Sequence, residues 1–224
     1  MSFGDKKLSE IAVSVPGSTS LLRKYDLDFC CGGSDTLAHA AAEKGLNVAE
    51  IETRLTELQN SKAENPEEYW VNATYPEIID HILVRYHQRH REQLQELIVL
   101  ADRVESVHGD REDCPMGVAA ELRNVYEDLS NHMMKEEHVL FPMIKAGNYM
   151  MAQMPIRMME MEHAEHGEHL DVLKSLTNNM TPPADACNTW LALYSGIQEF
   201  IDDLMMHIHR ENNILFPRVI AENH

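Results

Sequence analysis

Two stretches of the chain, His132-Met-Met-Lys-Glu-Glu-His-Val-Leu-Phe-Pro142 and His207-Ile-His-Arg-Glu-Asn-Asn-Ile-Leu-Phe-Pro217, repeat each other 75 residues apart. Both place a glutamate four residues after a histidine, and a Leu-Phe-Pro triplet after three further residues. A second pair, residues 87–94 and 163–170, shares the pattern His-x-x-His-x-x-x-Leu at an offset of 76 residues. The repeats predict two similar halves, each made of two helices and related by a pseudo-twofold axis.

The repeats lie in four long segments, at about 75–107, 116–146, 155–177 and 184–220. In each segment the apolar residues recur in alternating steps of four and three, the pattern of an amphipathic helix packed in a bundle. The short breaker-containing loops between the segments join antiparallel neighbours. The sequence therefore predicts an all-α fold, an up-down-up-down four-helix bundle over residues 73–224.

The first 62 residues have a different character and predict a small helical N-terminal domain. Short helical stretches, 18–25, 36–44 and about 48–59, are separated by breakers such as Pro16-Gly17 and by the Cys30-Cys31-Gly32-Gly33 loop. The polar stretch 61–72, which contains Pro66, is the expected boundary between the two domains.

Composition excludes several classes of partner. The chain carries 37 acidic and 19 basic residues, for a formal net charge of −18, and such a surface repels nucleic acid. It has no apolar run of about 18 residues and no apolar N-terminal stretch, so we expect neither a membrane span nor a signal peptide. The four cysteines form no Cys-x-x-Cys pair, and a reduced, cytoplasmic location is the simpler expectation.

Each apolar stripe is interrupted at two consecutive positions, and these positions hold only histidine and glutamate. Buried imidazoles and carboxylates cost several kcal/mol unless they have partners, and no lysine or arginine lies at the same level of the stripes. A bound metal would satisfy all of them together. The interrupting residues are His87, His90, His132, Glu136, His163, His166, His207 and Glu211.

The residue types indicate which metal. Imidazole and carboxylate ligands inside a helix bundle suit iron, with manganese as the second candidate. In His-x-x-x-Glu the histidine can bind one metal while the carboxylate one turn away reaches between two. We therefore expect two non-haem iron ions with an oxo or hydroxo bridge. Ligand counting leaves one position open on each six-coordinate iron.

These residues resemble known families. The C-terminal part resembles hemerythrin-like domains, although position 167 is glycine where oxygen carriers add a histidine, and the last motif is His-x-x-x-Glu. The whole chain resembles the repair of iron centres family, whose N-terminal domain carries the motif Cys-Cys-Gly-Gly. His90 and His166 are either hydrogen-bonding neighbours of the ligands or alternative ligands, and the resemblance favours the first interpretation. It implies the metal ligands His87, His132, Glu136, His163, His207 and Glu211.

The resemblance also implies a function. The family restores iron–sulfur clusters damaged by nitric oxide or oxidants under nitrosative or oxidative stress, and iron donation is the expected route. Two alternatives stay open: an enzyme that reduces nitric oxide, and a sensor or carrier of a diatomic gas. The expected partners are damaged iron–sulfur proteins, with nitric oxide or oxygen as small ligands; a homodimer is left open.

Some residues carry a weaker signal. Cys30 and Cys31 are either a structural loop pair or a reactive thiol pair for redox chemistry or metal transfer. Glu162 and Asp128 flank the ligands and are expected to be ordinary solvated side chains, with a path for metal or protons as the alternative. The histidines expected at the surface are His39, His81, His108, His138, His169, His209 and His224.

Overall fold

The computed structural model describes residues 2–61 and 64–222. Over these residues every extended regular element is helical, and no strand is formed. Residue 62, where the first predicted domain ends, and His224 lie outside this part of the chain. The predicted all-α class is confirmed.

The N-terminal residues form short helices because breakers and caps recur along them. Thr36, Asn47 and Asn65 accept hydrogen bonds at the starts of their helices through their side chains. The helices are a 3₁₀ turn at Phe3–Asp5, α1 (Leu8–Ser14), α2 (Ser18–Lys24), α3 (Leu37–Glu43), α4 (Val48–Asn60) and α5 (Pro66–Asn72). Their core includes Leu8, Ile11, Leu22, Phe29, Leu37, Ile51 and Leu55.

Helix α5 was not expected, since its residues lie in the polar stretch predicted as a boundary. Pro66 stands in its first turn, where a helix needs no backbone N–H, and the Asn65 side chain caps it. Proline at this position begins a helix rather than breaking one.

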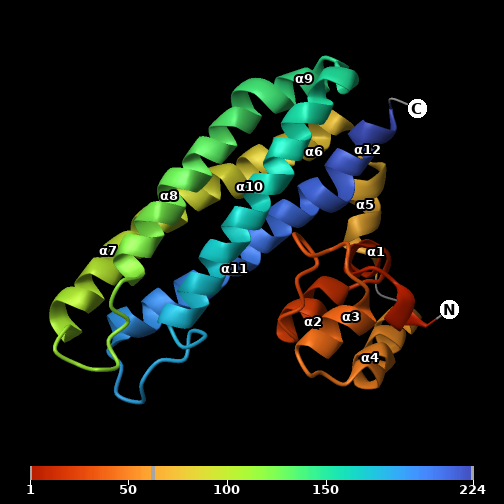
Figure 1. Ribbon diagram of the computed structural model, residues 1–224. Helices are drawn as coiled ribbons and strands as arrows, with labels where there is room; N and C mark the ends of the chain where they lie inside the picture. The colour runs from red at the N-terminus through yellow and green to blue at the C-terminus, as the bar shows by residue number, and fades with distance from the viewer. Residues whose placement is uncertain (1, 62–63, 223–224) are drawn as a thin grey trace. The chain divides into compact units, whose positions relative to one another are not determined.

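The four long segments form the predicted up-down-up-down bundle (Figure 1). Three of them are interrupted by π-helical turns, at Ile82–His87, Glu136–Leu140 and Glu211–Leu215. The α-helical parts are α6 (Tyr75–His81), α7 (Gln88–His108), α8 (Val118–Lys135), α9 (Phe141–Lys145), α10 (Tyr149–Leu176), α11 (Asn188–Arg210) and α12 (Phe216–Ala221). Helix α10 begins six residues before its predicted start and contains Pro155.

Each Leu-Phe-Pro triplet begins at the last residue of a π turn, Leu140 or Leu215. The backbone N–H of Phe141 donates to the carbonyl of Glu136, and Phe216 donates to Glu211 in the same way. Because a proline inside a helix clashes with the preceding turn, the sequence alone predicts that Pro142 and Pro217 kink or end the helix beyond each glutamate. Instead, the helix takes up about one extra residue per turn just before each proline, and it then continues as an α-helix beyond the proline.

A π turn shifts the helix surface by one residue, and this overturns part of the predicted stripe. Steps of three and four residues from Glu136 predict Val139 and Met143 in the core, but Val139 is 44% exposed and Met143 is half-buried. Leu140, Phe141 and Ile144 are buried in their place. A straight extrapolation of the four-three period fails here because a π turn adds one residue.

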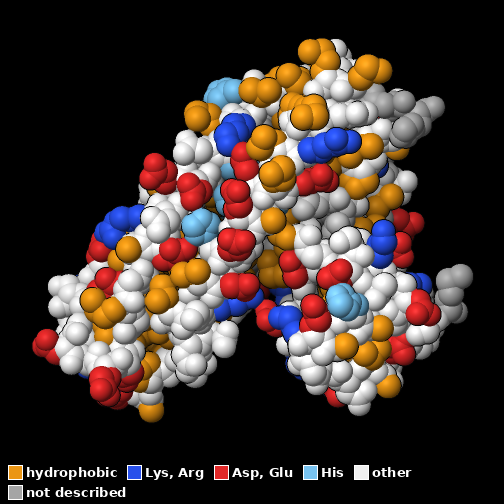
Figure 2. All heavy atoms as spheres, in the orientation of Figure 1, with side chains coloured by type: hydrophobic (Ala, Val, Ile, Leu, Met, Phe, Trp, Pro, Cys, Tyr) orange, Lys and Arg blue, Asp and Glu red, His pale blue; other side chains and the backbone are white. Residues whose placement is uncertain are grey.

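The described chain is organised as two compact units, Ile79–Met205 and Met1–Ile78 with Met206–His224. In the first unit the core is an apolar seam that includes Leu94, Leu97, Ala101, Val104, Leu122, Val125, Leu129 and Leu173. No described helix is both long and apolar enough to cross a membrane. Apolar side chains gather on the surface over α9 and the start of α10 (Figure 2), where Met150, Met151 and Met154 are exposed.

Candidate metal centre

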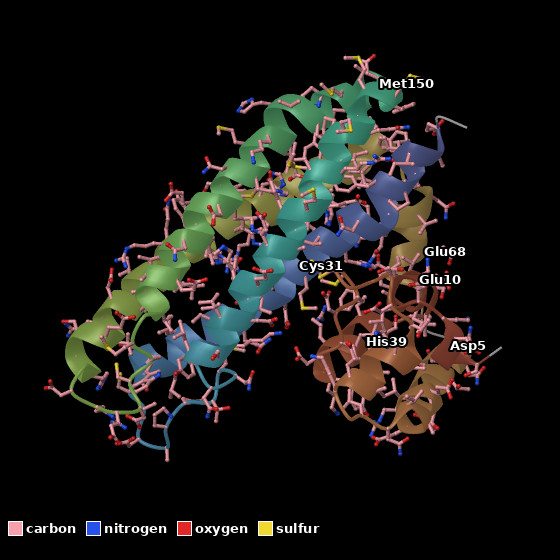
Figure 3. The ribbon with its side chains drawn as sticks, viewed as in Figure 1. Asp5, Glu10, Cys31, His39, Glu68 and Met150 are labelled. Carbon is pink, nitrogen blue, oxygen red and sulfur yellow. The ribbon has the colours of Figure 1, made fainter. Side chains whose placement is uncertain are left out.

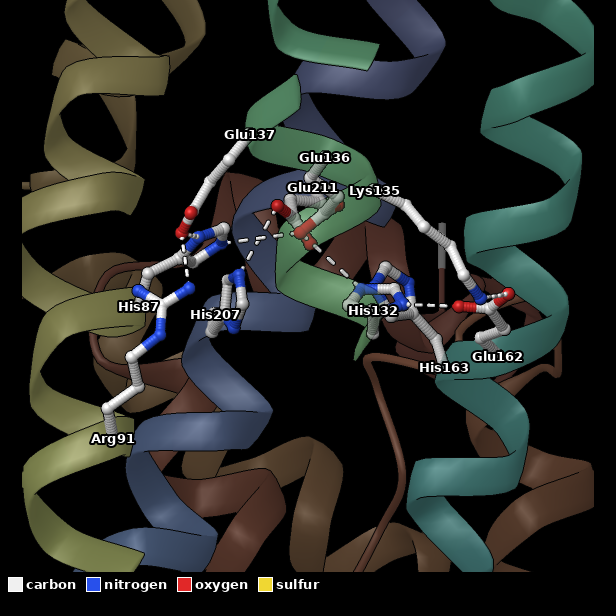
Figure 4. A network of polar contacts seen from close by, with 10 residues as sticks. All are labelled: His87, Arg91, His132, Lys135, Glu136, Glu137, Glu162, His163, His207 and Glu211. Atoms are coloured by element: carbon white, nitrogen blue, oxygen red, sulfur yellow. Dashed lines mark hydrogen bonds and ion pairs between the residues drawn. The ribbon is translucent and has the colours of Figure 1, made fainter. Parts of the chain in front are cut away.

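Four of the predicted ligands lie on α7, α8 and α10 or the π turns that adjoin them. The Oε2 atom of Glu136 lies 3.3 Å from Nε2 of His87 and 3.5 Å from Nε2 of His132. The Nε2 atoms of His132 and His163 are 3.1 Å apart. All four side chains are at most 1% exposed. Figure 4 shows their imidazoles turned towards the bundle interior.

His207 and Glu211 stand at the end of α11 and the start of the π turn that follows it. The i, i+4 spacing places Nε2 of His207 3.3 Å from Oε1 of Glu211. Both side chains are fully buried. The second His-x-x-x-Glu motif therefore has the local geometry of the first.

The ligand-capable atoms fall into two groups, in each of which all atoms lie within 4.8 Å of one another. Glu136 and Glu211 belong to both groups. The first group adds His87 and His207, and the second adds His132 and His163. The six predicted residues therefore all belong to groups whose atoms could hold a metal ion, and the two glutamates are common to both groups.

The donor chemistry fits a cation. Glu136 is fully buried, and neither of its oxygens accepts a hydrogen bond from the described residues. A buried carboxylate without compensation costs several kcal/mol, on the order of the loss for any unpaired buried charge. The neighbouring imidazoles offer nitrogen ligands to the same cation.

His90 and His166 are buried but belong to neither group. The His90 ring stacks on Tyr86 at 6.1 Å and meets Phe200 edge-on at 5.5 Å. The His166 ring meets His132 edge-on at 4.9 Å. These contacts place both histidines beside the predicted ligands.

Two carboxylates support ligand histidines from behind. Glu137 lies 2.8 Å from Nδ1 of His87 and pairs with Arg91 at 2.7 Å. With the ring proton on Nδ1, the Nε2 atom of His87 is left as the acceptor that faces Glu136. The hydrogen bond with His87, together with Arg91, lowers the pKa of Glu137 to about 2.

Glu162 hydrogen-bonds the ring of His132 in the way that Glu137 hydrogen-bonds the ring of His87. Its Oε2 lies 3.0 Å from Nδ1 of His132, and its other oxygen accepts from Lys135 at 2.6 Å (Figure 4). These contacts lower the pKa of Glu162 to about 2. The side chain is therefore not the ordinary solvated one expected from the sequence. It lines a cavity of about 230 Å³ together with Asp128, Lys135, His166 and His169.

The sequence did not predict that Glu137 and Glu162 would hydrogen-bond the predicted ligand histidines, and the reason is the same for both. Each carboxylate supports a histidine on a different helix, and the periodicity of one helix carries no information about its neighbour. The sequence held only a weak indication of the Glu137 contact. Glu137 is a second acidic residue directly after Glu136, and Arg91 is a basic residue one turn after His87.

His209 contradicts the expectation that every off-stripe histidine lies at the surface. It is fully buried, its Nδ1 lies 2.8 Å from the Asn213 amide, and its ring meets Phe29 edge-on at 5.4 Å. Its Nε2 lies 3.4 Å from a carboxylate oxygen of Glu67. The N-terminal residues bury this face of α11. His39 and His138 are exposed as expected, and His81, His108 and His169 are half-buried.

Cys30 and Cys31 lie in the loop between α2 and α3, and Figure 3 labels Cys31. Neither forms a disulfide; Cys30 is buried and Cys31 is half-buried. The contact with Cys31 and burial raise the pKa of the Cys30 thiol well above its ordinary value.

Comparisons with known proteins agree with this geometry. Residues 78–219 match the hemerythrin HHE cation binding domain, and residues 4–59 match ScdA_N, a domain of unknown function. The hemerythrin-like match makes non-haem iron the expected cation, and the two clusters of histidine and glutamate supply suitable ligands.

Full-length relatives are also found. A protein of Haemophilus influenzae named "Probable iron-sulfur cluster repair protein" is 67% identical over 99% of this chain and 100% of its own. The iron-sulfur cluster repair proteins YtfE of Musicola paradisiaca and Citrobacter koseri are 54% and 56% identical, over 98% and 99% of both chains. The chain belongs to the family of iron-sulfur cluster repair proteins.

Proposed function

We propose that this protein repairs damaged iron–sulfur clusters by donating iron from a two-iron centre in its helix bundle. The observation that carries the proposal is the pair of buried ligand groups that share Glu136 and Glu211. Membership of the repair family supports the role, and the damaged iron–sulfur proteins are the recipients.

The proposed ligand set follows the two groups. His87 and His207 hold one iron, and His132 and His163 hold the other. Glu136 and Glu211 lie in both groups, so each carboxylate reaches both ions. Two imidazoles and two carboxylate oxygens leave each ion short of six ligands, and a site with open positions can exchange its cargo.

A route for iron is suggested by the cavity beside α8 and α10. Glu162 lines this cavity and also hydrogen-bonds His132, so the same side chain faces the cavity and a ligand. Asp128 adds a second carboxylate to the lining. Carboxylates favour a hard divalent cation along the way.

The test is the iron content and Mössbauer spectrum of the purified protein, before and after anaerobic mixing with a cluster-depleted iron–sulfur protein. We expect two antiferromagnetically coupled irons per chain that decline as clusters form in the partner. Ferrous protein should lose iron to a chelator faster than ferric protein. Zinc or no metal in the purified chain would overturn the two-iron centre.

The same experiment separates the alternatives. Iron that stays in place while nitric oxide is consumed with a reductant would identify a nitric oxide-reducing enzyme. Stable, reversible gas binding without turnover or iron loss would identify a sensor or carrier. No contact among the described residues favours either alternative over donation.

Other sequence expectations stay predictions. The division into a helical domain at 1–62 and a bundle at 73–224 is one, and its two parts correspond to the two family matches at 4–59 and 78–219. The cytoplasmic location, the gas ligands and a homodimer are others. A thiol role for Cys30 and Cys31 is developed below.

A further inference from the structure

The loop between α2 and α3 is wrapped around one carboxylate. The Asp28 side chain accepts hydrogen bonds from the backbone N–H groups of Cys30, Cys31 and Gly32 at 3.0, 2.9 and 2.8 Å. The Sγ atom of Cys30 lies 3.1 Å from Oδ1 of Asp28. The carboxylate and both thiols thus lie close together in the loop.

The spacing of the two sulfurs is informative. The Sγ atoms of Cys30 and Cys31 are 3.8 Å apart, much longer than a disulfide bond of about 2.05 Å. Two thiolates bound tetrahedrally at about 2.3 Å from one zinc-sized cation would be about 3.8 Å apart. The ligand-capable atoms of Asp28, Cys30 and Cys31 all lie within 4.8 Å of one another.

A second observation concerns what holds the loop. Asn212 and Asn213 donate to the backbone carbonyls of Cys30 and Phe29 at 3.0 and 2.8 Å. In the first copy of the repeat the equivalent residues are Glu137 and His138. Glu137 supports a metal ligand, whereas its counterpart Asn212 fixes the cysteine loop.

The two copies of the repeat therefore differ at the positions that contact the loop. His209, whose counterpart is Met134, also touches Phe29 with its ring. A loop fixed at consecutive carbonyls loses little further entropy when a ligand binds. Its three ligand atoms are preorganised, and half-buried Cys31 leaves one side open to solvent.

We propose that Asp28, Cys30 and Cys31 form a separate metal site for one thiophilic divalent cation, with the fourth position open. Binding exchanges the two thiol protons for the cation: two S–H bonds break, two metal–sulfur bonds form, and two protons leave to solvent. No electron is transferred. The open position suits a ligand from a protein that receives the cation. The identification of ferrous iron as the natural ion of this site rests on the proposed donor function. The proposal that the site binds a thiophilic cation does not depend on that function.

The test uses cobalt(II) as the probe on the full, iron-loaded, reduced chain under anaerobic conditions. A sulfur-to-cobalt charge-transfer band should rise and saturate at about one equivalent per chain. Histidine and glutamate ligands give no such band, so the readout is specific to thiolate ligation. Cys31→Ser should abolish the band, and Asp28→Asn should weaken cobalt binding by about 10–100-fold.

Cys187→Ser is the matched control, because Cys187 is a free thiol outside the loop and its loss should leave the band unchanged. Thermal unfolding of each variant verifies that the chain still folds. No band in the unaltered chain, a band that survives Cys31→Ser, or one lost in Cys187→Ser would overturn the site. Mössbauer spectra of the same samples report the bundle iron independently, so failure of the two-iron centre and failure of the loop site are distinguishable.

Discussion

Glu136 belongs to both ligand groups, and its Oε2 atom lies within 3.5 Å of imidazoles on two helices. Its burial, and the absence of a hydrogen bond to either oxygen from the described residues, support the proposed role of Glu136 as a cation ligand. Residues such as Glu137 and Glu162 act one step further out, by fixing the orientation of ligand imidazoles.

Replacing Glu136 by leucine should therefore empty the centre. We expect iron content to fall from about two to below about one ion per chain, because a carboxylate shared by both positions is lost. His90→Ala is the control: it removes a buried histidine outside both ligand groups and should retain most of the iron. The iron content per chain of both purified variants tests this assignment. If the His90→Ala variant lacks iron while the Glu136→Leu variant retains it, the ligand assignment is wrong.

The carboxylates of Glu137 and Glu162 should make the metal-free fold sensitive to acid. Their pKa of about 2 lies below the ordinary value of 4.5, so they stabilise the fold above about pH 4.5. This contribution is lost as the pH falls from about 4.5 to about 2. Urea midpoints measured across this window should fall more in the unaltered chain than in the Glu137→Gln/Glu162→Gln variant. Glu96→Gln, an exposed change, should follow the unaltered chain.

At the scale of the elements, the π turns and close helix contacts determine which side chains face inward. A π turn at Glu136 or Glu211 presents the glutamate inward and then shifts the following residues by one position. Helices α7 and α11 approach closely at Gly196, where a Cβ would lie 2.7 Å from Cδ2 of Leu97.

Gly196→Ala tests that approach. In the unaltered background we expect a loss of roughly 1 kcal/mol, because overpacking costs about 1–3 kcal/mol and alanine's helix propensity returns about 1. In the Leu97→Ala background the clash is removed, and the same substitution should become stabilising. Denaturant unfolding of the four members of this cycle measures the sign change; equal effects in both backgrounds would show that the contact carries no strain.

The asparagines of the last π turn should control the cysteine loop. Asn212→Ala/Asn213→Ala removes two hydrogen bonds to loop carbonyls, each of about 1 kcal/mol. Amide hydrogen exchange should rise over residues 27–33 while the middle of α8 keeps its protection. Asn124→Ala, which changes an exposed asparagine on α8, is the control and should leave the loop unchanged. Unaltered exchange in the double variant would mean that the loop is held by other contacts.

At the scale of the whole molecule, the turn after α11 belongs to the same compact unit as the N-terminal helices. A buried ion pair between Glu67 and Arg210 contributes to this unit, with Arg210 also stacked over the ring of Trp70 at 4.8 Å. Removing one partner of such a pair typically costs about 3–5 kcal/mol.

Iron should stabilise the folded chain as a ligand of the native state only. At a free metal concentration about 100-fold above Kd, the gain is about 2.7 kcal/mol, which raises Tm by roughly 5–10 °C in a chain of this size. Calorimetry of iron-loaded and chelator-treated protein measures the difference. The Glu136→Leu variant should show little difference between the two states; an equal shift in that variant would place the stabilising metal elsewhere.

The sequence by itself determined the helical class, the order of the long helices and the eight buried histidines and glutamates that interrupt the apolar stripes. These follow from periodicity and residue type, because an apolar stripe interrupted only by ligand side chains is readable along one helix. Only the tertiary structure decided the π-turn register at Val139, the support of His87 by Glu137 and the burial of His209. Each of these depends on what packs against a helix from another part of the chain, and the pattern of a single helix does not contain that information.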